Sequence, residues 1–156
     1  GLRLVQIREP GLAADERKAF AQAVVLRCRA VGALVLVNDD LELARCTKAD
    51  GLHLPACRLA ELDERPDFEW VGASCHNRAE LEKAAALGFD YAVLGNVKPT
   101  LSHPERAPLG WEAFAGMIGQ LPLPVLALGG LAASDLTDAK TAGAHGIAAI
   151  RSIWQG

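Results

Sequence analysis

Seven short runs of apolar residues recur along the chain, and this recurrence constrains the fold more than any other feature of the sequence. The runs are residues 4–8, 33–38, 51–54, 70–75, 91–95, 125–130 and 146–150. Most are continuous rather than alternating with polar residues, which is typical of parallel strands that are covered on both faces. We therefore predict an α/β domain built on a parallel sheet.

Stretches with helical character separate these runs. Residues 15–31 place Phe20, Val24, Leu26 and Val31 among charged residues, residues 77–87 are rich in alanine, and residues 134–142 begin with Ser134 as the expected cap. Gly32, Gly88 and Gly143 each stand where a left-handed residue ends a helix just before a strand. Regular βα alternation favours a barrel, and the active face of such barrels lies at the carboxyl ends of the strands.

Composition and charge argue against several classes of partner. The 156 residues carry a formal net charge of −3 and no long run of Lys or Arg, so we expect no nucleic acid and no membrane as partner. Apolar stretches all fall short of the roughly 18 residues that a membrane helix requires. The four cysteines form no Cys-x-x-Cys pair and no secretory signal is recognisable, which predicts a reducing, cytoplasmic location.

A glycine pair follows the apolar run at residues 125–128. Gly129 and Gly130 allow backbone N–H groups to approach a phosphate, and the last strands of a barrel often share one phosphate between their loops. Arg151, after the last run, is a candidate to pair with that phosphate. The alternatives are a tight turn that needs glycine for its conformation alone, and an arginine that is an ordinary surface charge.

Polar residues after the first two runs suggest a second anion or metal site. Asn38, Asp39 and Asp40 suit either the cap of a helix at residues 41–47 or a Mg²⁺ or diphosphate site, and both roles can be shared among them. Arg8 is a candidate to hold a diphosphate, with a surface ion pair to Glu9 as the alternative.

Three histidines receive different interpretations. His76 follows a strand and is a candidate acid, base or pocket wall, against the alternative of a structural residue under the next loop. His53 lies inside an apolar run and is interpreted as a hydrogen-bonded residue of the barrel, and His145 as a structural residue on the opposite rim. The loop at residues 96–109, with three prolines, is expected to be a lid over the active face.

Together these sequence motifs resemble those of the thiamine phosphate synthase and TenI family. The matching stretches, in order, are residues 6–9, 37–39, 50–54, 72–76, 90–95, 124–130 and 143–150. The resemblance implies a (β/α)8 TIM barrel that couples hydroxymethylpyrimidine diphosphate to a thiazole phosphate, with Mg²⁺, and releases diphosphate in thiamine biosynthesis. Because seven strands are visible, the expected fold is this barrel without its first βα unit, with residues 1–156 as one domain cut from a longer chain.

The resemblance also assigns roles to individual residues. It places Gln6, Arg8, Asn38 and Asp39 at diphosphate, pyrimidine and Mg²⁺ positions, Ser74 and Thr100 at substrate contacts, and Gly129, Gly130 and Ile150 at the thiazole-phosphate cradle. Together with the residues singled out above and the family positions that are substituted here, the expected catalytic residues are Arg8, Asn38, His76 and His103, and the expected metal ligand is Asp39. The expected substrate-binding residues are Gln6, Ser74, Asn96, Thr100, Gly129, Gly130, Ile150 and Arg151. The second Mg²⁺ carboxylate of the synthases is replaced by Arg58, which makes the cofactor doubtful. Two diphosphate-binding lysines of the family are also replaced, by Pro10 and His103.

Further departures leave two other functions open. A TenI-like thiazole tautomerase also lacks the second carboxylate, but its catalytic histidine corresponds to Asn96, which cannot shuttle a proton at neutral pH. Pro10, residues 102–104 and 150–151, and Trp154 resemble the variant found behind a Nudix hydrolase, so a non-catalytic phosphate-binding module linked to an N-terminal Nudix domain is the other alternative. An incomplete barrel exposes strand edges and would favour a homodimer.

Overall fold

A parallel sheet with helices along its outer face makes up the fold. The computed structural model describes residues 2–100, 107–150 and 152, and within them it confirms seven strands that pair in chain order. The strands are β1 (Leu4–Ile7), β2 (Leu34–Asn38), β3 (Gly51–Leu54), β4 (Trp70–Cys75), β5 (Tyr91–Gly95), β6 (Val125–Leu128) and β7 (Gly146–Ala148). The helices are α1 (Ala14–Ala30), α2 (Leu41–Thr47), α3 (Ala56–Glu61), α4 (Arg78–Ala86), α5 (Gly110–Ile118) and α6 (Leu136–Thr141).

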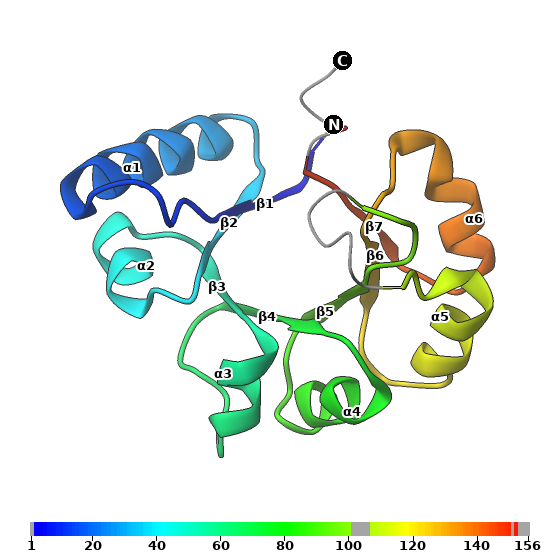
Figure 1. Ribbon diagram of the computed structural model, residues 1–156. Helices are drawn as coiled ribbons and strands as arrows, with labels where there is room; N and C mark the ends of the chain where they lie inside the picture. Colours follow the sequence, from blue (N-terminus) through cyan, green and yellow to red (C-terminus); the bar gives the residue numbers. More distant parts are fainter. Residues whose placement is uncertain (1, 101–106, 151, 153–156) are drawn as a thin grey trace.

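The sheet curls but does not close within the described residues. Every neighbouring pair is parallel, and β1 and β7 remain as the two edges of the sheet. Figure 1 shows the strands curving around a central axis with the helices outside them, as in a TIM barrel with an open side. The expected barrel-type fold with seven visible strands is therefore confirmed.

Alternate residues of each strand serve two cores. Val35, Val37 and Leu52 point outward into the main core beneath the helices, whereas Leu36 and Tyr91 belong to a smaller cluster inside the curl. This alternation follows from the two-residue period of a strand. Both faces are apolar, which explains why the strands appear in the sequence as continuous apolar runs.

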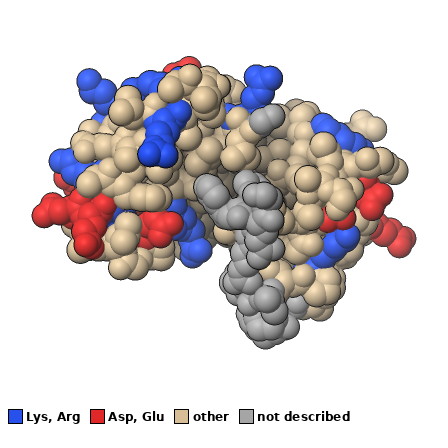
Figure 2. Space-filling model, turned by 90° about the horizontal axis from the view of Figure 1, so that it is seen from above, with Lys and Arg blue, Asp and Glu red and all other residues tan. Residues whose placement is uncertain are grey.

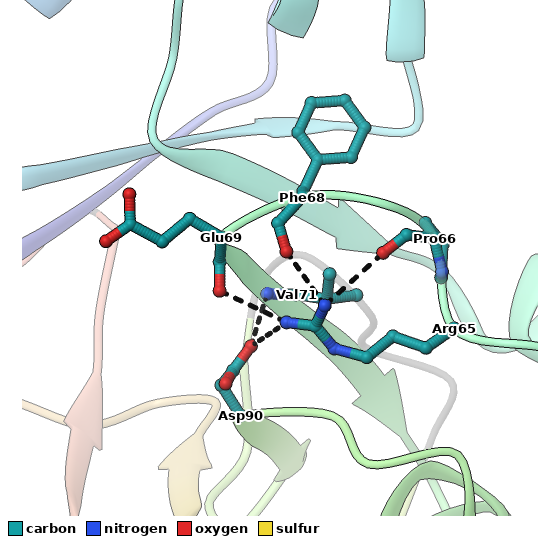
Figure 3. Close-up of polar contacts among 6 residues, drawn as sticks. All are labelled: Arg65, Pro66, Phe68, Glu69, Val71 and Asp90. Carbon is teal, nitrogen blue, oxygen red and sulfur yellow. Dashed lines mark hydrogen bonds and ion pairs between the residues drawn. The ribbon is translucent and has the colours of Figure 1, made fainter.

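Aspartates at the amino ends of two strands fasten the sheet together. The Asp50 carboxylate accepts a hydrogen bond from the Val35 N–H at 2.8 Å, and the Asp90 carboxylate accepts one from Val71 N–H at 2.7 Å. Arg65 reinforces the second aspartate, since its Nη2 lies 2.7 Å from Asp90 Oδ2 (Figure 3). In both places the aspartate that precedes one strand accepts the N–H of the second residue of the neighbouring strand.

Side-chain caps fix where helices begin, and one expected cap is wrong. Asp40 Oδ1 accepts from Leu43 N at 2.9 Å and begins α2 as predicted, and Asn77 caps α4 in the same way. Ser134, however, lies within a 3₁₀ turn, Ala133–Asp135, and the Asp135 carboxylate accepts from Ala132 N at 2.9 Å. The helix α6 itself begins at Leu136, and Asp135 at its N-cap position accepts no hydrogen bond from the first turn, so α6 has no side-chain cap.

The buried face of α1 also differs from the expectation. Ala21 and Val25 are buried, whereas Phe20, Leu26 and Val31 are exposed. The helix packs mainly on β2 and α2, and small residues allow it to approach them closely. Of the four large apolar residues named for this helix, Val24 alone packs against the core, where it is partly buried.

The surface carries mixed charge. Figure 2 shows acidic and basic side chains interspersed on the visible face, without a broad basic patch. Among the helices of the described residues, none is long and apolar enough to cross a bilayer.

Candidate functional site

Several of the predicted site residues lie at the carboxyl ends of the strands. Gln6 is in β1, Asn38 ends β2, and Ser74 is the penultimate residue of β4. Because all strands are parallel, these ends share one rim of the curled sheet. The structure joins two of them directly, since Gln6 Nε2 donates a hydrogen bond to Asn38 Oδ1 at 2.8 Å. Each amide therefore fixes the orientation of the other.

Asp39 directly follows β2 and pairs with a cation. Its backbone has a φ of +51° and its N–H donates to His53 O at 2.9 Å, which turns the chain away from the strand. Arg58 Nε then lies 3.0 Å from Asp39 Oδ1, and Arg58 Nη1 lies 3.3 Å from Glu61 Oε2. The hydrogen bond with Asp39, above all, raises the pKa of Arg58, so this group keeps its charge.

The residues at this rim do not fit a resident Mg²⁺ ion. The Asp39 carboxylate is already paired with a guanidinium, so a divalent cation bound there would lie against a like charge. The neighbouring Asp40 carboxylate uses Oδ1 to cap α2, and its Oδ2 lies 3.5 Å from Arg17. Within the part of the chain that the structure describes, no group of three or more metal-ligating side chains comes together. The magnesium site expected at Asp39 therefore gains no support.

A buried polar line reaches the rim from below. His53 has no exposed surface, its Nδ1 lies 2.8 Å from the Tyr91 hydroxyl, and its Nε2 lies 2.9 Å from Ser74 Oγ. Burial lowers the pKa of His53 to about 4 and raises that of Tyr91. Both side chains are therefore neutral at pH 7. The interpretation of His53 as a hydrogen-bonded barrel residue is confirmed.

The glycine pair after β6 lies against the segment after β5. Gly129 and Gly130 have φ values of +99° and +65°, and a Cβ would overlap Asn96 at Gly129 and the Pro99 carbonyl at Gly130. Val97 N–H donates to Leu128 O at 2.8 Å, and Lys98 N–H donates to Gly129 O at 3.0 Å. Glycine is thus required at both positions by conformation and by space. This requirement is compatible both with a phosphate-binding turn and with a tight turn that binds nothing.

A lysine stands beside this turn. Lys98 Nζ lies 2.7 Å from Asp135 Oδ1, and this hydrogen bond is the main cause that lowers the pKa of Asp135. The salt bridge joins the segment after β5 to the 3₁₀ turn after β6. It holds a cation next to the glycine pair.

Six further residues are predicted to take part in the site. His76 is half-exposed and its Nδ1 lies 3.3 Å from Glu80 Oε2, at the start of α4. Arg8 and Ile150 are exposed, and Thr100 is half-buried. His103 and Arg151 lie outside the described residues. The roles of these six residues stay predictions.

Tyr91 and Lys98 are the residues that reasoning from the sequence missed as parts of the site. Tyr91 begins the apolar run at residues 91–95, to which no site role was assigned. The alternation of side chains along the strands would have found it. Residues 51 and 53 in β3 and residues 91 and 93 in β5 all face the inside of the curl, which brings the Tyr91 phenol near the His53 imidazole. Cys75, in contrast, is buried, and desolvation raises the pKa of its thiol to about 12, so it is inert at neutral pH.

Comparisons with known proteins agree on one family. A family model described as thiamine monophosphate synthase matches residues 1–153. The thiamine-phosphate synthase of Chromobacterium violaceum is 39% identical over 160 residues, which cover 99% of this chain and 76% of that protein. That of Halorhodospira halophila is 31% identical with the same coverage. The structure of a thiamine phosphate pyrophosphorylase from Pyrococcus furiosus superposes with a TM-score of 0.79 at 24% identity, covering 96% of this chain and 73% of that one, and supports the fold.

Proposed function

The chain belongs to the thiamine monophosphate synthase family, and from this membership we propose that it couples hydroxymethylpyrimidine diphosphate to a thiazole phosphate. In this reaction the C–O bond to the diphosphate breaks, the thiazole nitrogen supplies the electron pair for the new C–N bond, and diphosphate leaves. The observation that carries the proposal is the gathering of the polar residues of β1, β2 and β4 at the carboxyl rim of a chain that matches the family from residue 1 to 153.

The pyrimidine is assigned to the side of the rim formed by β1, β2 and β4. The Gln6 and Asn38 amides, which orient each other at 2.8 Å, offer both donors and acceptors to a heteroaromatic ring. Ser74 adds a hydroxyl whose position is fixed by His53. A rim of neutral, oriented groups suits an uncharged aromatic ring better than it suits a phosphate.

Arginines supply positive charge for the departing diphosphate. Arg8 follows β1, and Arg58 is exposed beside Asp39. An exposed ion pair contributes little stability, so a polyphosphate can compete with the carboxylates for the Arg58 guanidinium. Stabilisation of the negative charge that develops on the leaving group lowers the barrier to ionisation. No step of this proposal passes through Mg²⁺, because the residues at Asp39 do not fit it.

The thiazole phosphate is assigned to the glycine pair. Gly129 and Gly130 have positive φ values, a backbone conformation common in anion-binding turns, and Lys98, paired with Asp135, lies beside them. With the two substrates on opposite halves of the rim, the thiazole nitrogen would face the pyrimidine, as transfer of the pyrimidine group to that nitrogen requires.

Calorimetric titration with thiazole phosphate tests the proposal. We expect saturable binding, and weaker binding of the same thiazole without its phosphate. Absence of binding at millimolar thiazole phosphate would contradict the proposed function.

The remaining expectations from the resemblance stay predictions. A linked Nudix domain is tested by the sequence upstream of Gly1, a homodimer by light scattering, and a cytoplasmic location by fractionation. A tautomerase is the weaker proposal, because Asn96 replaces the expected histidine and its amide lies 3.5 Å from Lys98 O.

A further inference from the structure

Three polar side chains form a continuous line through the interior of the curled sheet. Tyr91 begins β5 at the amino end, His53 lies within β3, and Ser74 lies near the carboxyl end of β4. The distances along the line are 2.8 Å from Tyr91 Oη to His53 Nδ1 and 2.9 Å from His53 Nε2 to Ser74 Oγ. His53 is fully buried and Tyr91 is 6% exposed, so the bond between them lies in the interior, whereas Ser74 is half-buried.

The direction of the hydrogen bonds follows from the phenol. Tyr91 has one hydroxyl proton, and the only acceptor for it among the described residues is His53 Nδ1. If Nδ1 carried a proton instead, the buried phenolic proton would have no acceptor, which is costly. Tyr91 therefore donates to Nδ1.

The tautomer of His53 also sets the direction of its hydrogen bond with Ser74. Burial lowers the pKa of His53 to about 4, so at neutral pH the ring is uncharged and carries a single proton. With Nδ1 accepting from Tyr91, that proton is on Nε2, which donates to Ser74 Oγ. Ser74 then keeps its own hydroxyl proton for another acceptor.

We propose that Tyr91 and His53 are positioning residues that hold Ser74 as a hydrogen-bond donor to an acceptor atom of the pyrimidine substrate. The inference rests on the proposed function for the identity of the substrate. It goes beyond that function because it assigns a direction to the bond and a role to Tyr91, which begins β5 at the amino end of the sheet. A neutral hydroxyl donor of this kind favours an unprotonated ring nitrogen, which has a free lone pair, over a protonated ring nitrogen.

The tautomer of His53 tests the relay without any substrate. In the protein labelled with ¹⁵N-histidine, long-range ¹H–¹⁵N spectra distinguish the two neutral tautomers and the charged ring, and His53→Gln identifies the signal. We expect the Nε2–H tautomer at pH 7. An Nδ1–H tautomer or a charged ring would overturn the proposal.

A double-mutant cycle tests the link to the substrate. Ser74→Ala should lower kcat/KM by about 10- to 100-fold and Tyr91→Phe by about 10-fold. If Tyr91 acts through Ser74, the double variant should be no slower than Ser74→Ala alone. Independent, additive losses would mean a merely structural role for Tyr91 and would overturn the proposal.

A control variant separates effects on stability from effects on the reaction. Thr47→Val removes a buried hydroxyl that donates to Leu43 O in α2, so it should affect stability but leave kcat/KM unchanged. Thermal unfolding confirms that each variant is folded. If the wild type forms no thiamine phosphate, the proposed function and the role of Ser74 toward the substrate fail together. A wrong tautomer in an active enzyme overturns the relay alone.

Discussion

Arg58 Nε lies 3.0 Å from Asp39 Oδ1, so a guanidinium already neutralises the carboxylate that the family resemblance assigns to a metal. The same arginine also pairs with Glu61. This arrangement explains how a chain of this family can present an aspartate at the carboxyl rim without a site for a divalent cation.

Arg58→Asp should create a divalent-cation site. The substitution removes the competing cation and adds a second carboxylate beside Asp39, and paired carboxylates bind Mg²⁺ and Mn²⁺. We expect Mn²⁺ titration, followed by electron paramagnetic resonance, to show binding in the variant and none in the wild type at the same concentrations. Arg58→Ala is the matched control, since it frees Asp39 without adding a ligand and should bind more weakly. Tight binding by the wild type would contradict this account of the rim.

Acid should destabilise the fold through His53. Its pKa is lowered to about 4 in the folded state from 6.5, so between these values the unfolded chain binds more protons. Stability is therefore fully present above pH 6.5 and is lost as the pH falls toward 4, by about 2 kcal/mol between pH 7 and 5. Urea unfolding at several pH values measures this. His53→Gln should lose that dependence, and an unchanged slope in this variant would show that another group causes it.

Gly130→Ala should impair both the fold and phosphate binding. A methyl group there would overlap the Pro99 carbonyl, and the residue has a positive φ. We expect a loss of about 1–3 kcal/mol of stability and weaker thiazole phosphate binding in calorimetry. Gly116→Ala in α5 is the control, because a Cβ there meets no atom within 4 Å. It should leave binding unchanged and raise stability by up to about 1 kcal/mol. Equal effects of the two substitutions would refute the steric argument.

Arg65→Ala should destabilise the fold without affecting the reaction. The guanidinium donates to the Phe68 carbonyl at 2.8 Å, the Glu69 carbonyl at 3.1 Å and the Asp90 carboxylate at 2.7 Å, at the amino end of the sheet (Figure 3). Its loss should cost about 1–3 kcal/mol in denaturant unfolding. Arg27→Ala on the exposed side of α1 is the control and should have little effect. A large fall in kcat for Arg65→Ala would contradict its purely structural role.

The sheet was predictable from the sequence because its strands are covered on both faces, and continuous apolar runs identified all seven. A cap was predictable among residues 38–40, where Asp40 begins α2, but not at Ser134, because a 3₁₀ turn over Ala133–Asp135 moves the start of α6 to Leu136. The face of α1 was not predictable, because Ala21 contributes close packing rather than apolar bulk. At the site, the family resemblance pointed to Gln6, Asn38 and Ser74 but not to Tyr91. Tyr91 in β5 reaches His53 in β3 across the intervening strand β4, and a linear pattern does not contain this order of strands.

Formation of thiamine phosphate by the purified chain tests the central claim most directly. The protein is mixed with hydroxymethylpyrimidine diphosphate and thiazole phosphate, and the product is oxidised to its fluorescent thiochrome derivative and quantified. We predict thiamine phosphate formation that depends on both substrates, persists in the presence of EDTA and falls in Ser74→Ala. No product above the rate without protein, at substrate concentrations that saturate binding, would contradict the assignment of this chain as a synthase.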